Sequence, residues 1–261
     1  MIKRLGIVVP TLGTRTELLQ QCITSIRSLE DVHICLVMPE GSPARDRFSV
    51  QVESVVGDQG RGLAGAINAG ISSLPDSIEF VNWICDDDTI VAEGYRRMLK
   101  VLVDNQSTVL VHSHCCYIDI NGRELFRVRS GRWSEHLLRF GPQLISQPAI
   151  LFRRNAFENV GRLDEGLGFA FDLDFLLRLR KIGDFQPLSV VAARYRWHHG
   201  ALSVKRRDES VREASQIRIK HMPGFVRRVS PLWEPLMRWL ILSVGMRLQR
   251  TLDDPHETSV S

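Results

Sequence analysis

The stretch Phe80-Val81-Asn82-Trp83-Ile84-Cys85-Asp86-Asp87-Asp88 joins an apolar run directly to three consecutive carboxylates. The run predicts a buried strand over 79–85. A strand that ends in clustered carboxylates brings negative charge to the edge of a sheet, where open α/β folds bind their ligands. Crowded carboxylates repel one another unless a cation offsets them, and hard oxygen ligands select Mg²⁺ or Mn²⁺, ions that usually hold phosphates. The stretch therefore indicates a metal-dependent site for a phosphorylated substrate, with an acidic, solvated turn as the alternative.

Strands and helices alternate around this stretch. We predict strands over 5–9, 32–38 and 50–56, and helices over 17–29, 63–73 and 91–103. This alternation predicts an α/β fold with a Rossmann-like, mostly parallel sheet, right-handed crossovers and flanking helices.

The pattern after residue 105 is mixed. The predicted strands are 108–119, 123–129 and 148–153, the first two joined by the hairpin signal Asn121-Gly122. A helix over 172–182 and an extended segment over 185–196 follow. We therefore divide the chain into a domain over 1–203, with halves 1–105 and 106–203, and a basic helical extension over 204–261.

Composition is that of an ordinary globular protein, with 44% hydrophobic and 25% charged residues among 261. The five cysteines are odd in number and no signal peptide is recognisable, so we expect reduced thiols and a cytoplasmic location. The net charge of +4 is uneven: residues 205–250 carry eleven Lys and Arg against four Asp and Glu. This basic segment indicates either an acidic partner, such as lipid headgroups or a phosphorylated substrate, or an ordinary solvated helix face.

The extension also contains an amphipathic pattern. Its apolar stripe is formed by Trp233, Leu236, Met237, Leu240, Ile241, Val244 and Leu248. Such a helix either packs on the main domain or a second subunit, which is the commoner case, or lies on the inner face of a membrane.

Three further segments carry chemistry. Pro10-Thr11 ends the first predicted strand, where free backbone N–H groups and a hydroxyl can meet a nucleotide. Asp172 stands at the start of a predicted helix, as a helix-terminal carboxylate or as a general base for a hydroxyl nucleophile. Arg196 and His198 follow a predicted strand and suit a phosphate clamp or a metal site. The loop 57–62 lacks both Walker A and dinucleotide-binding spacing.

In this order, the segments resemble family 2 of the inverting glycosyltransferases, which have the GT-A fold. The resemblance runs from about Leu5 to Ser203 and rests on the segments Val8-Val9-Pro10-Thr11, 62–71, Asp86-Asp87-Asp88 as the DXD motif, 147–154, 160–165, Asp172-Leu173-Asp174 and Tyr195-Arg196-Trp197-His198. It implies transfer of a sugar from a nucleoside diphosphate sugar, UDP- or dTDP-linked, to an acceptor hydroxyl in polysaccharide or glycolipid synthesis. The acceptor would be a saccharide or a lipid-linked molecule, and no nucleic acid would be bound.

The resemblance also implies residue roles. Asp172 would be the catalytic base, and Asp88 and His198 would hold Mn²⁺ or Mg²⁺. The donor-binding residues would be Pro10, Thr11, Arg15, Glu40, Asn68, Asp86 and Asp87. This sequence departs from the family at three positions. Pro39 stands where the family usually has a base-contacting aspartate, which Glu40 would replace. Ile67 stands where an arginine is usual, and Phe171 stands where an acidic residue often precedes the catalytic aspartate.

Three alternatives stay open. A sugar-phosphate nucleotidyltransferase would need a basic, glycine-rich N-terminal loop, for which 12–15 is a poor substitute. Against a catalytically silent nucleotide-sugar-binding subunit stands the presence of Asp86, Asp88, Asp172 and His198 together. His112, His114 and Cys116 would share one face of a strand and suggest zinc, but no second ligand pair has the spacing of a structural zinc site.

Overall fold

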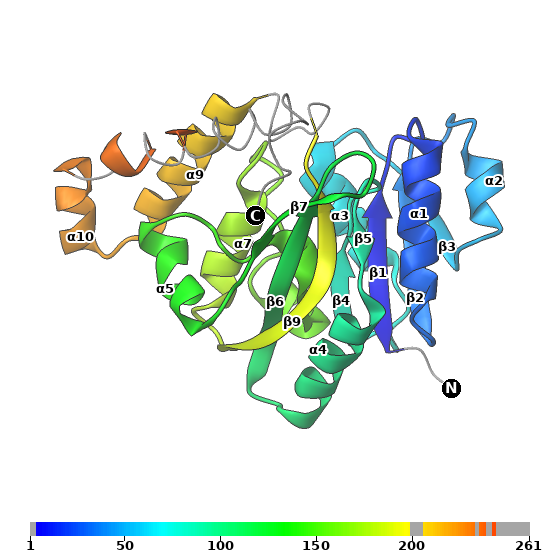
Figure 1. Cartoon of the computed structure of the whole chain (residues 1–261), viewed down its shortest axis with the longest axis horizontal. Helices are drawn as coiled ribbons and strands as arrows, with labels where there is room; N and C mark the ends of the chain where they lie inside the picture. Colours follow the sequence, from blue (N-terminus) through cyan, green and yellow to red (C-terminus); the bar gives the residue numbers. More distant parts are fainter. Residues whose placement is uncertain (1–3, 199–205, 233–234, 239–241, 244–261) are drawn as a thin grey trace, which may run out of the picture.

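The computed structural model describes residues 4–198, 206–232, 235–238 and 242–243 (Figure 1). Its first half is a parallel sheet of four strands, β1 (Leu5–Pro10), β2 (Val32–Met38), β3 (Ser54–Gly57) and β4 (Phe80–Trp83). Their order is β3-β2-β1-β4, and every pairing among them is parallel. The connections contain α1 (Thr16–Arg27), α2 (Arg45–Ser49) and α3 (Gly62–Ser73). The alternation predicted from the sequence is confirmed.

The second half continues the same sheet with mixed pairing. The strands are β5 (Thr89–Ile90), β6 (Thr108–Ile118), β7 (Glu124–Val128), β8 (Ile150–Arg153) and β9 (Asp184–Arg196). From β4 the order runs β8-β6-β9-β5, with β7 paired to β6. β6 and β9 are parallel, whereas β8 is antiparallel to both β4 and β6. The helices of this half are α4 (Ala92–Asp104), α5 (Arg132–Phe140), α6 (Arg154–Asn159) and α7 (Phe171–Leu179).

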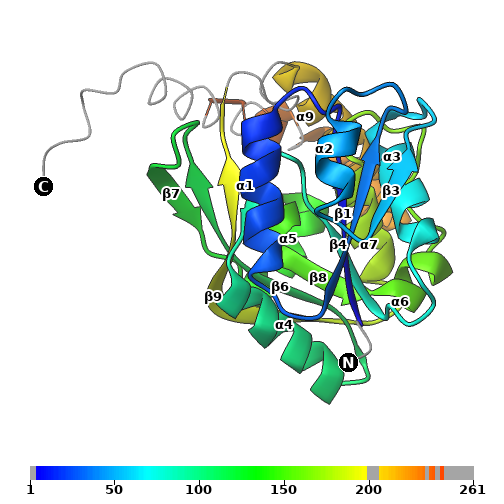
Figure 2. The same ribbon diagram turned by 90° about the vertical axis from the view of Figure 1, so that its right-hand side faces the viewer.

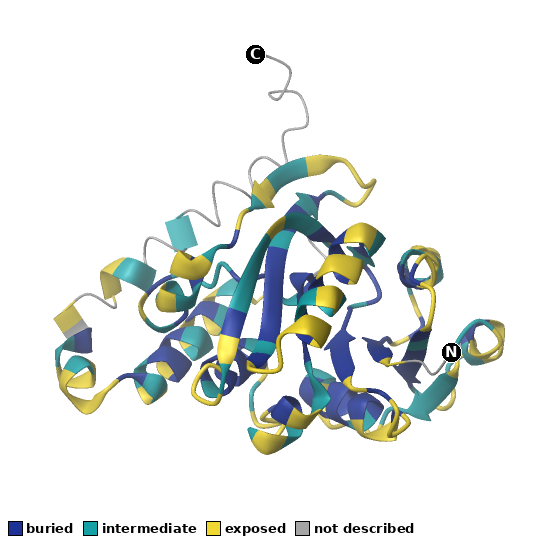
Figure 3. Ribbon diagram, turned by 90° about the horizontal axis from the view of Figure 1, so that it is seen from below, coloured by how far each residue is buried: buried dark blue, intermediate teal, exposed yellow. Residues whose placement is uncertain are grey.

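Both faces of the central strands are covered, which explains why β1, β2 and β4 are mostly apolar and almost fully buried. Along β1, Ile7 and Val9 pack in one cluster with α1 and α4, whereas Val8 packs on the other face with α3 and α7. Figure 2 shows α1 and α4 on one side of β1 and β4, with α3 on the other. The buried strands lie between helices whose outer surfaces are exposed (Figure 3).

An aromatic cluster fixes α7 against the sheet. Phe175 of α7 has its ring centroid 6.1 Å from that of Trp83 in β4 and 5.0 Å from that of Phe152 in β8. All three side chains are at most 1% exposed. Burial of each such ring contributes about 1.5–3 kcal/mol, so α7 is held firmly beneath the end of β4.

The structure corrects several predicted boundaries. The strand predicted over 50–56 begins only at Ser54, because residues 50–53 form a turn after α2 and Val50 is 84% exposed. The strand predicted over 148–153 begins at Ile150, because Pro148 lies in a 3₁₀ turn. The short elements α2, α5, α6 and β5 were not predicted. β6 has register irregularities on both sides of His114, so the two-residue alternation expected there is broken.

The C-terminal part contains α9 (Arg207–His221), α10 (Gly224–Val229) and a 3₁₀ turn at Ser230–Leu232. α9 contacts α5 and α7, on the opposite side of the molecule from α1 and α2 (Figure 1). Most of the predicted apolar stripe, including Trp233, Leu240, Ile241, Val244 and Leu248, lies outside the described residues. In the described ranges, no helix has the length and apolar character needed to cross a bilayer.

Candidate active site

The ends of β1 and β4 bring distant polar residues together. The chain beyond β4 stays beside β1, because the Ile84 N–H donates to the Val8 carbonyl at 2.9 Å. The Thr11 hydroxyl can therefore donate to Oδ2 of Asp86 at 2.5 Å. Arg15, just before α1, donates from Nη2 to Asp86 and from Nη1 to Asp87 at 2.5 Å. The acidic turn thus faces the N-terminal end of α1, as the sequence predicted for a sheet edge.

The three aspartates are almost fully buried, with exposed fractions of 3%, 8% and 1% for Asp86, Asp87 and Asp88. Burial raises the pKa of Asp86 despite its bonds to Thr11 and Arg15. Burial, together with the Asp87 charge, raises the pKa of Asp88 well above its usual range. Burial also acts on Asp87, but bonds from His198 and Arg15 outweigh it and lower its pKa. Burial thus opposes ionisation of Asp86 and Asp88, and a bound cation would favour their ionised forms.

The end of β9 closes the acidic turn from the other side. The backbone N–H of Arg196 donates to Oδ1 of Asp88 at 2.8 Å, and its Nε donates to the Asp87 carbonyl at 2.8 Å. The remaining guanidinium nitrogens bond to the carbonyls of Asp119 and Ile120 and to Gln21. Arg196 is therefore buried and holds this turn in place through its hydrogen bonds. His198 Nε2 lies 3.0 Å from Oδ2 of Asp87.

The donor chemistry fits a hard divalent ion. Cys85, Asp87 and Asp88 each offer one ligand atom, and these atoms lie within 4.8 Å of one another. A thiol is a soft ligand and carboxylates are hard ones, so Asp87 and Asp88 are the members that suit Mg²⁺ or Mn²⁺. His198, which the resemblance places on the metal, bonds to Asp87. In the part of the chain that the structure describes, His112, His114 and Cys116 do not form such a group.

Asp172 lies in the first turn of α7 and is partly exposed to a cavity that the acidic turn also lines. Its Oδ2 accepts a 2.8 Å hydrogen bond from Nε2 of Gln143, and its Oδ1 faces the N–H of Leu173. Burial raises the pKa of Asp172, although both hydrogen bonds oppose that rise. A carboxylate with a raised pKa at a cavity wall can accept a proton from a hydroxyl group.

Most of the predicted site residues line one cavity of about 780 Å³. Eight predicted residues line it: Pro10, Thr11, Arg15, Asp86, Asp87, Asp88, Asp172 and His198. Its wall also includes Gln147, which donates to the Trp83 carbonyl at 2.7 Å, and the aromatic residues Trp83, Phe169, Phe171 and Tyr195. Ser210 of α9 lines it too, so the C-terminal extension contributes to the cavity.

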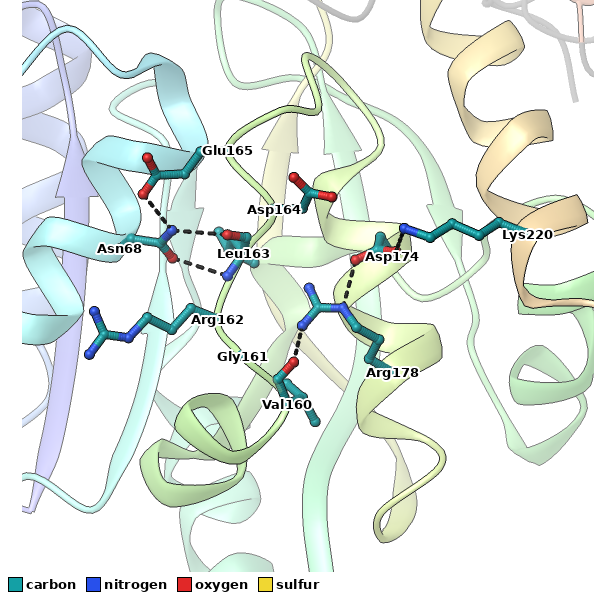
Figure 4. A pocket seen from close by; sticks show the side chains of 10 residues that line it. All are labelled: Asn68, Val160, Gly161, Arg162, Leu163, Asp164, Glu165, Asp174, Arg178 and Lys220. Atoms are coloured by element: carbon teal, nitrogen blue, oxygen red, sulfur yellow. Dashed lines mark hydrogen bonds and ion pairs between the residues drawn. The ribbon is translucent and has the colours of Figure 1, made fainter.

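Two predicted donor-binding residues lie elsewhere. Glu40 is exposed after β2 and does not line the cavity. Asn68 is buried in α3 and bonds to both backbone groups of Leu163 and to Glu165 (Figure 4). It borders a separate, open hollow of about 500 Å³, whose wall includes the Asp174–Arg178 pair. In this structure, Asn68 fixes the 163–165 loop rather than facing the cavity.

Several residues that shape the site have no distinguishing pattern in the sequence. Gln143 bonds to Asp172, which is 29 residues away along the chain. Glu213 bonds to backbone N–H groups of residues 168–170, which are 43 to 45 residues away. Gln147 and Arg196 do fall in segments that the resemblance contains, but their bonds to backbone carbonyls of the acidic region depend on the fold.

Comparisons with known proteins give fold-level similarity. No family model and no curated protein matches the chain. A crystal structure of S. aureus TarS 1–349 matches with a TM-score of 0.58 and 14% identity. The TarS complexes with UDP and with UDP-GlcNAc match with TM-scores of 0.59 and 0.61, at 12% and 13% identity. These matches cover 87% of this chain and 72–73% of TarS 1–349. The chain therefore has the GT-A-like fold of TarS, a family 2 glycosyltransferase.

Proposed function

We propose that this protein is an inverting glycosyltransferase that moves a sugar from a UDP- or dTDP-linked donor to an acceptor hydroxyl. The observation that supports this proposal most strongly is the single cavity that contains both the acidic turn and Asp172. A nucleoside diphosphate sugar needs both features, because its diphosphate leaves with negative charge while the acceptor loses a proton.

The donor half of the proposal uses the ends of β1 and β4. Thr11, Arg15 and Asp86 would bind the nucleotide and the sugar, and Arg15 brings a guanidinium suited to phosphate. Asp88 and Asp87 would hold Mg²⁺ or Mn²⁺, with His198 beside them. The ion would supply positive charge to the leaving diphosphate. The TarS complexes hold UDP and UDP-GlcNAc in a similar fold, which supports a nucleotide-linked donor.

The acceptor half uses Asp172. Its carboxylate would take the proton from the acceptor hydroxyl as that oxygen attacks the anomeric carbon from the face opposite the diphosphate. The bond between the anomeric carbon and the diphosphate oxygen breaks, and the nucleoside diphosphate leaves with both electrons. Attack from the opposite face inverts the anomeric configuration. Gln143 would keep Asp172 oriented toward the cavity.

For the acceptor, we propose a saccharide or a lipid-linked saccharide, handled at the cytoplasmic face of a membrane. The basic C-terminal part supports this proposal, because Arg227 and Arg228 lie beside Phe225, which is 79% exposed. The five cysteines are free, which suits a reducing compartment. Cosedimentation with anionic vesicles, compared with neutral vesicles of equal size, tests the membrane contact: equal binding to both would contradict an electrostatic one.

A thermal-shift panel of UDP, dTDP and GDP, each with and without Mn²⁺, tests the proposed donor. We expect UDP or dTDP to raise the melting temperature in the presence of the ion, since a ligand at a hundredfold excess over Kd stabilises by about 2.7 kcal/mol. Stabilisation by none of the three nucleotides would contradict the proposed function.

A further inference from the structure

The carboxylate of Glu213 in α9 binds three consecutive backbone N–H groups. Oε2 accepts from Gly168 at 3.1 Å, and Oε1 accepts from Phe169 at 2.8 Å and from Ala170 at 2.7 Å. These residues lead directly into α7, whose own boundary residue provides no side-chain cap. The first N–H groups of a helix lack partners within it, and the positive end of the helix dipole favours a carboxylate. Of the three, only the N–H of Ala170, the boundary residue of α7, belongs to the helix end, so Glu213 holds mainly the loop that enters α7.

The segment 168–170, which Glu213 binds, borders the cavity. Gly168, Phe169, Phe171 and Asp172 all line the cavity, so the place where Glu213 acts and the proposed base are separated by only one residue. The residue just before α9 makes a second contact with the same segment, because the Arg206 guanidinium lies 5.1 Å from the centroid of the Phe169 ring. From its far side, α7 is held by the Phe175 aromatic cluster. The segment 168–172 is thus fixed between the core and α9.

We propose that Glu213 is a positioning residue for glycosyl transfer: by holding the backbone of 168–170, it sets where Asp172 stands in the cavity. This inference rests on the proposed function, and it extends the active unit beyond the sheet domain into α9. Glu213 acts through the backbone and donates or accepts no proton in the reaction. Its loss should therefore slow turnover without weakening the donor site, whose residues come from β1, the acidic turn and β9.

The test compares Glu213→Gln and Glu213→Ala with wild type, and Asp208→Asn serves as the matched control. Asp208 is an exposed acidic residue in the first turn of the same helix. UDP release from UDP-GlcNAc with Mn²⁺ gives kcat and KM. Amide hydrogen exchange of residues 168–170 reports the hydrogen bonds to Glu213 directly. A displacement of about 1 Å at a reacting group can cost about a hundredfold in rate.

We expect Glu213→Ala to lower kcat about a hundredfold and Glu213→Gln about tenfold, because the amide keeps one acceptor oxygen for Phe169 and Ala170. The KM for UDP-GlcNAc should stay within about twofold of wild type, since the loss lies in positioning rather than in donor binding. Exchange at 168–170 should quicken in the same order, while Asp208→Asn matches wild type in all three measurements.

The outcomes separate this inference from the proposed function. An active wild type with unchanged kcat in Glu213→Gln and Glu213→Ala would overturn the positioning role. A raised KM with unchanged kcat would overturn it as well, because Glu213 would then act on donor binding. A wild type that neither binds UDP with Mn²⁺ nor releases UDP would contradict the proposed function, while hydrogen exchange would still show whether Glu213 holds the segment. Unchanged hydrogen exchange in both variants would overturn the claim that Glu213 holds the backbone of 168–170.

Discussion

The hydroxyl of Thr11 donates a 2.5 Å hydrogen bond to Oδ2 of Asp86, although 75 residues separate the two along the chain. Both residues follow strands that are parallel neighbours, β1 and β4. The bond therefore joins the first loop of the protein to its acidic turn, and it satisfies one oxygen of a carboxylate that is 3% exposed.

Removal of that hydroxyl should destabilise the fold. Thr11→Val keeps the shape of the side chain but leaves a buried carboxylate oxygen without its donor, which costs about 1–3 kcal/mol. The free energy of unfolding in urea measures this loss. Thr14→Val is the control, because Thr14 is exposed in the same loop and its substitution should change stability by less than about 0.5 kcal/mol. Equal effects from the two variants would show that the Thr11–Asp86 bond adds nothing.

Asp88 should control the metal dependence of nucleotide binding. Asp88→Ala removes one of the two clustered carboxylates that suit a hard cation. We expect Mn²⁺ to strengthen UDP binding to wild type, measured by calorimetry, and to have little effect on UDP binding to the variant. Asp174→Ala is a control for loss of a buried carboxylate outside the cavity. Unchanged Mn²⁺-dependent affinity in Asp88→Ala would move the metal site elsewhere.

The pH dependence of turnover should report Asp172. A base works only when deprotonated, so the rate falls as pH drops through its pKa; because burial raises that pKa, the fall should begin above the usual range of an aspartate, about 3.9. The bond from Gln143 lowers the same pKa, so Gln143→Leu should move the fall to higher pH. Gln20→Leu is the control, because it removes the side-chain hydrogen bonds between Gln20 of α1 and Gln51 in the turn after α2. A shift to lower pH in Gln143→Leu would contradict this account.

Asp174 should stabilise the fold in a pH-dependent way. Burial raises its pKa, but bonds from His221 and Arg178 outweigh burial and bring it to about 2. The folded pKa is thus below the unfolded value of about 3.9, so the stabilisation is complete above the unfolded pKa and is lost as pH falls toward 2. The difference in unfolding free energy between wild type and Asp174→Asn should shrink from pH 6 to pH 3. A constant difference would show that the ion pairs do not produce it.

The sequence was sufficient for the sheet and for most of the cavity, because both depend on local patterns. The apolar run 80–85 predicts a buried strand by itself, and parallel strands place their following residues, such as Thr11 and Asp86, at one edge. The outcome was different for Asn68. Its position in α3 is apparent from the sequence, but its bonds to Leu163 depend on a loop 95 residues away.

Contacts between helices were the least predictable part. Glu213 stands in a helix with several other charged residues, and nothing in the local pattern distinguishes it from exposed neighbours such as Glu209. Its role depends on three backbone N–H groups that converge only when α9 packs beside α7. Likewise, α5 was not predicted, although its first turn is capped locally: the Gly131 N–H donates to the Ser134 hydroxyl at 3.0 Å.

The most direct test of the central claim is Asp172→Asn, with turnover and nucleotide binding measured on the same preparation. The asparagine keeps the size of the side chain and can still accept from Gln143, but it cannot take a proton from the acceptor. We expect nucleoside diphosphate release to fall by about 10²–10⁴, while UDP affinity with Mn²⁺ stays within about twofold of wild type. Turnover at the wild-type rate in Asp172→Asn would contradict the assignment of the base and, with it, the proposed mechanism.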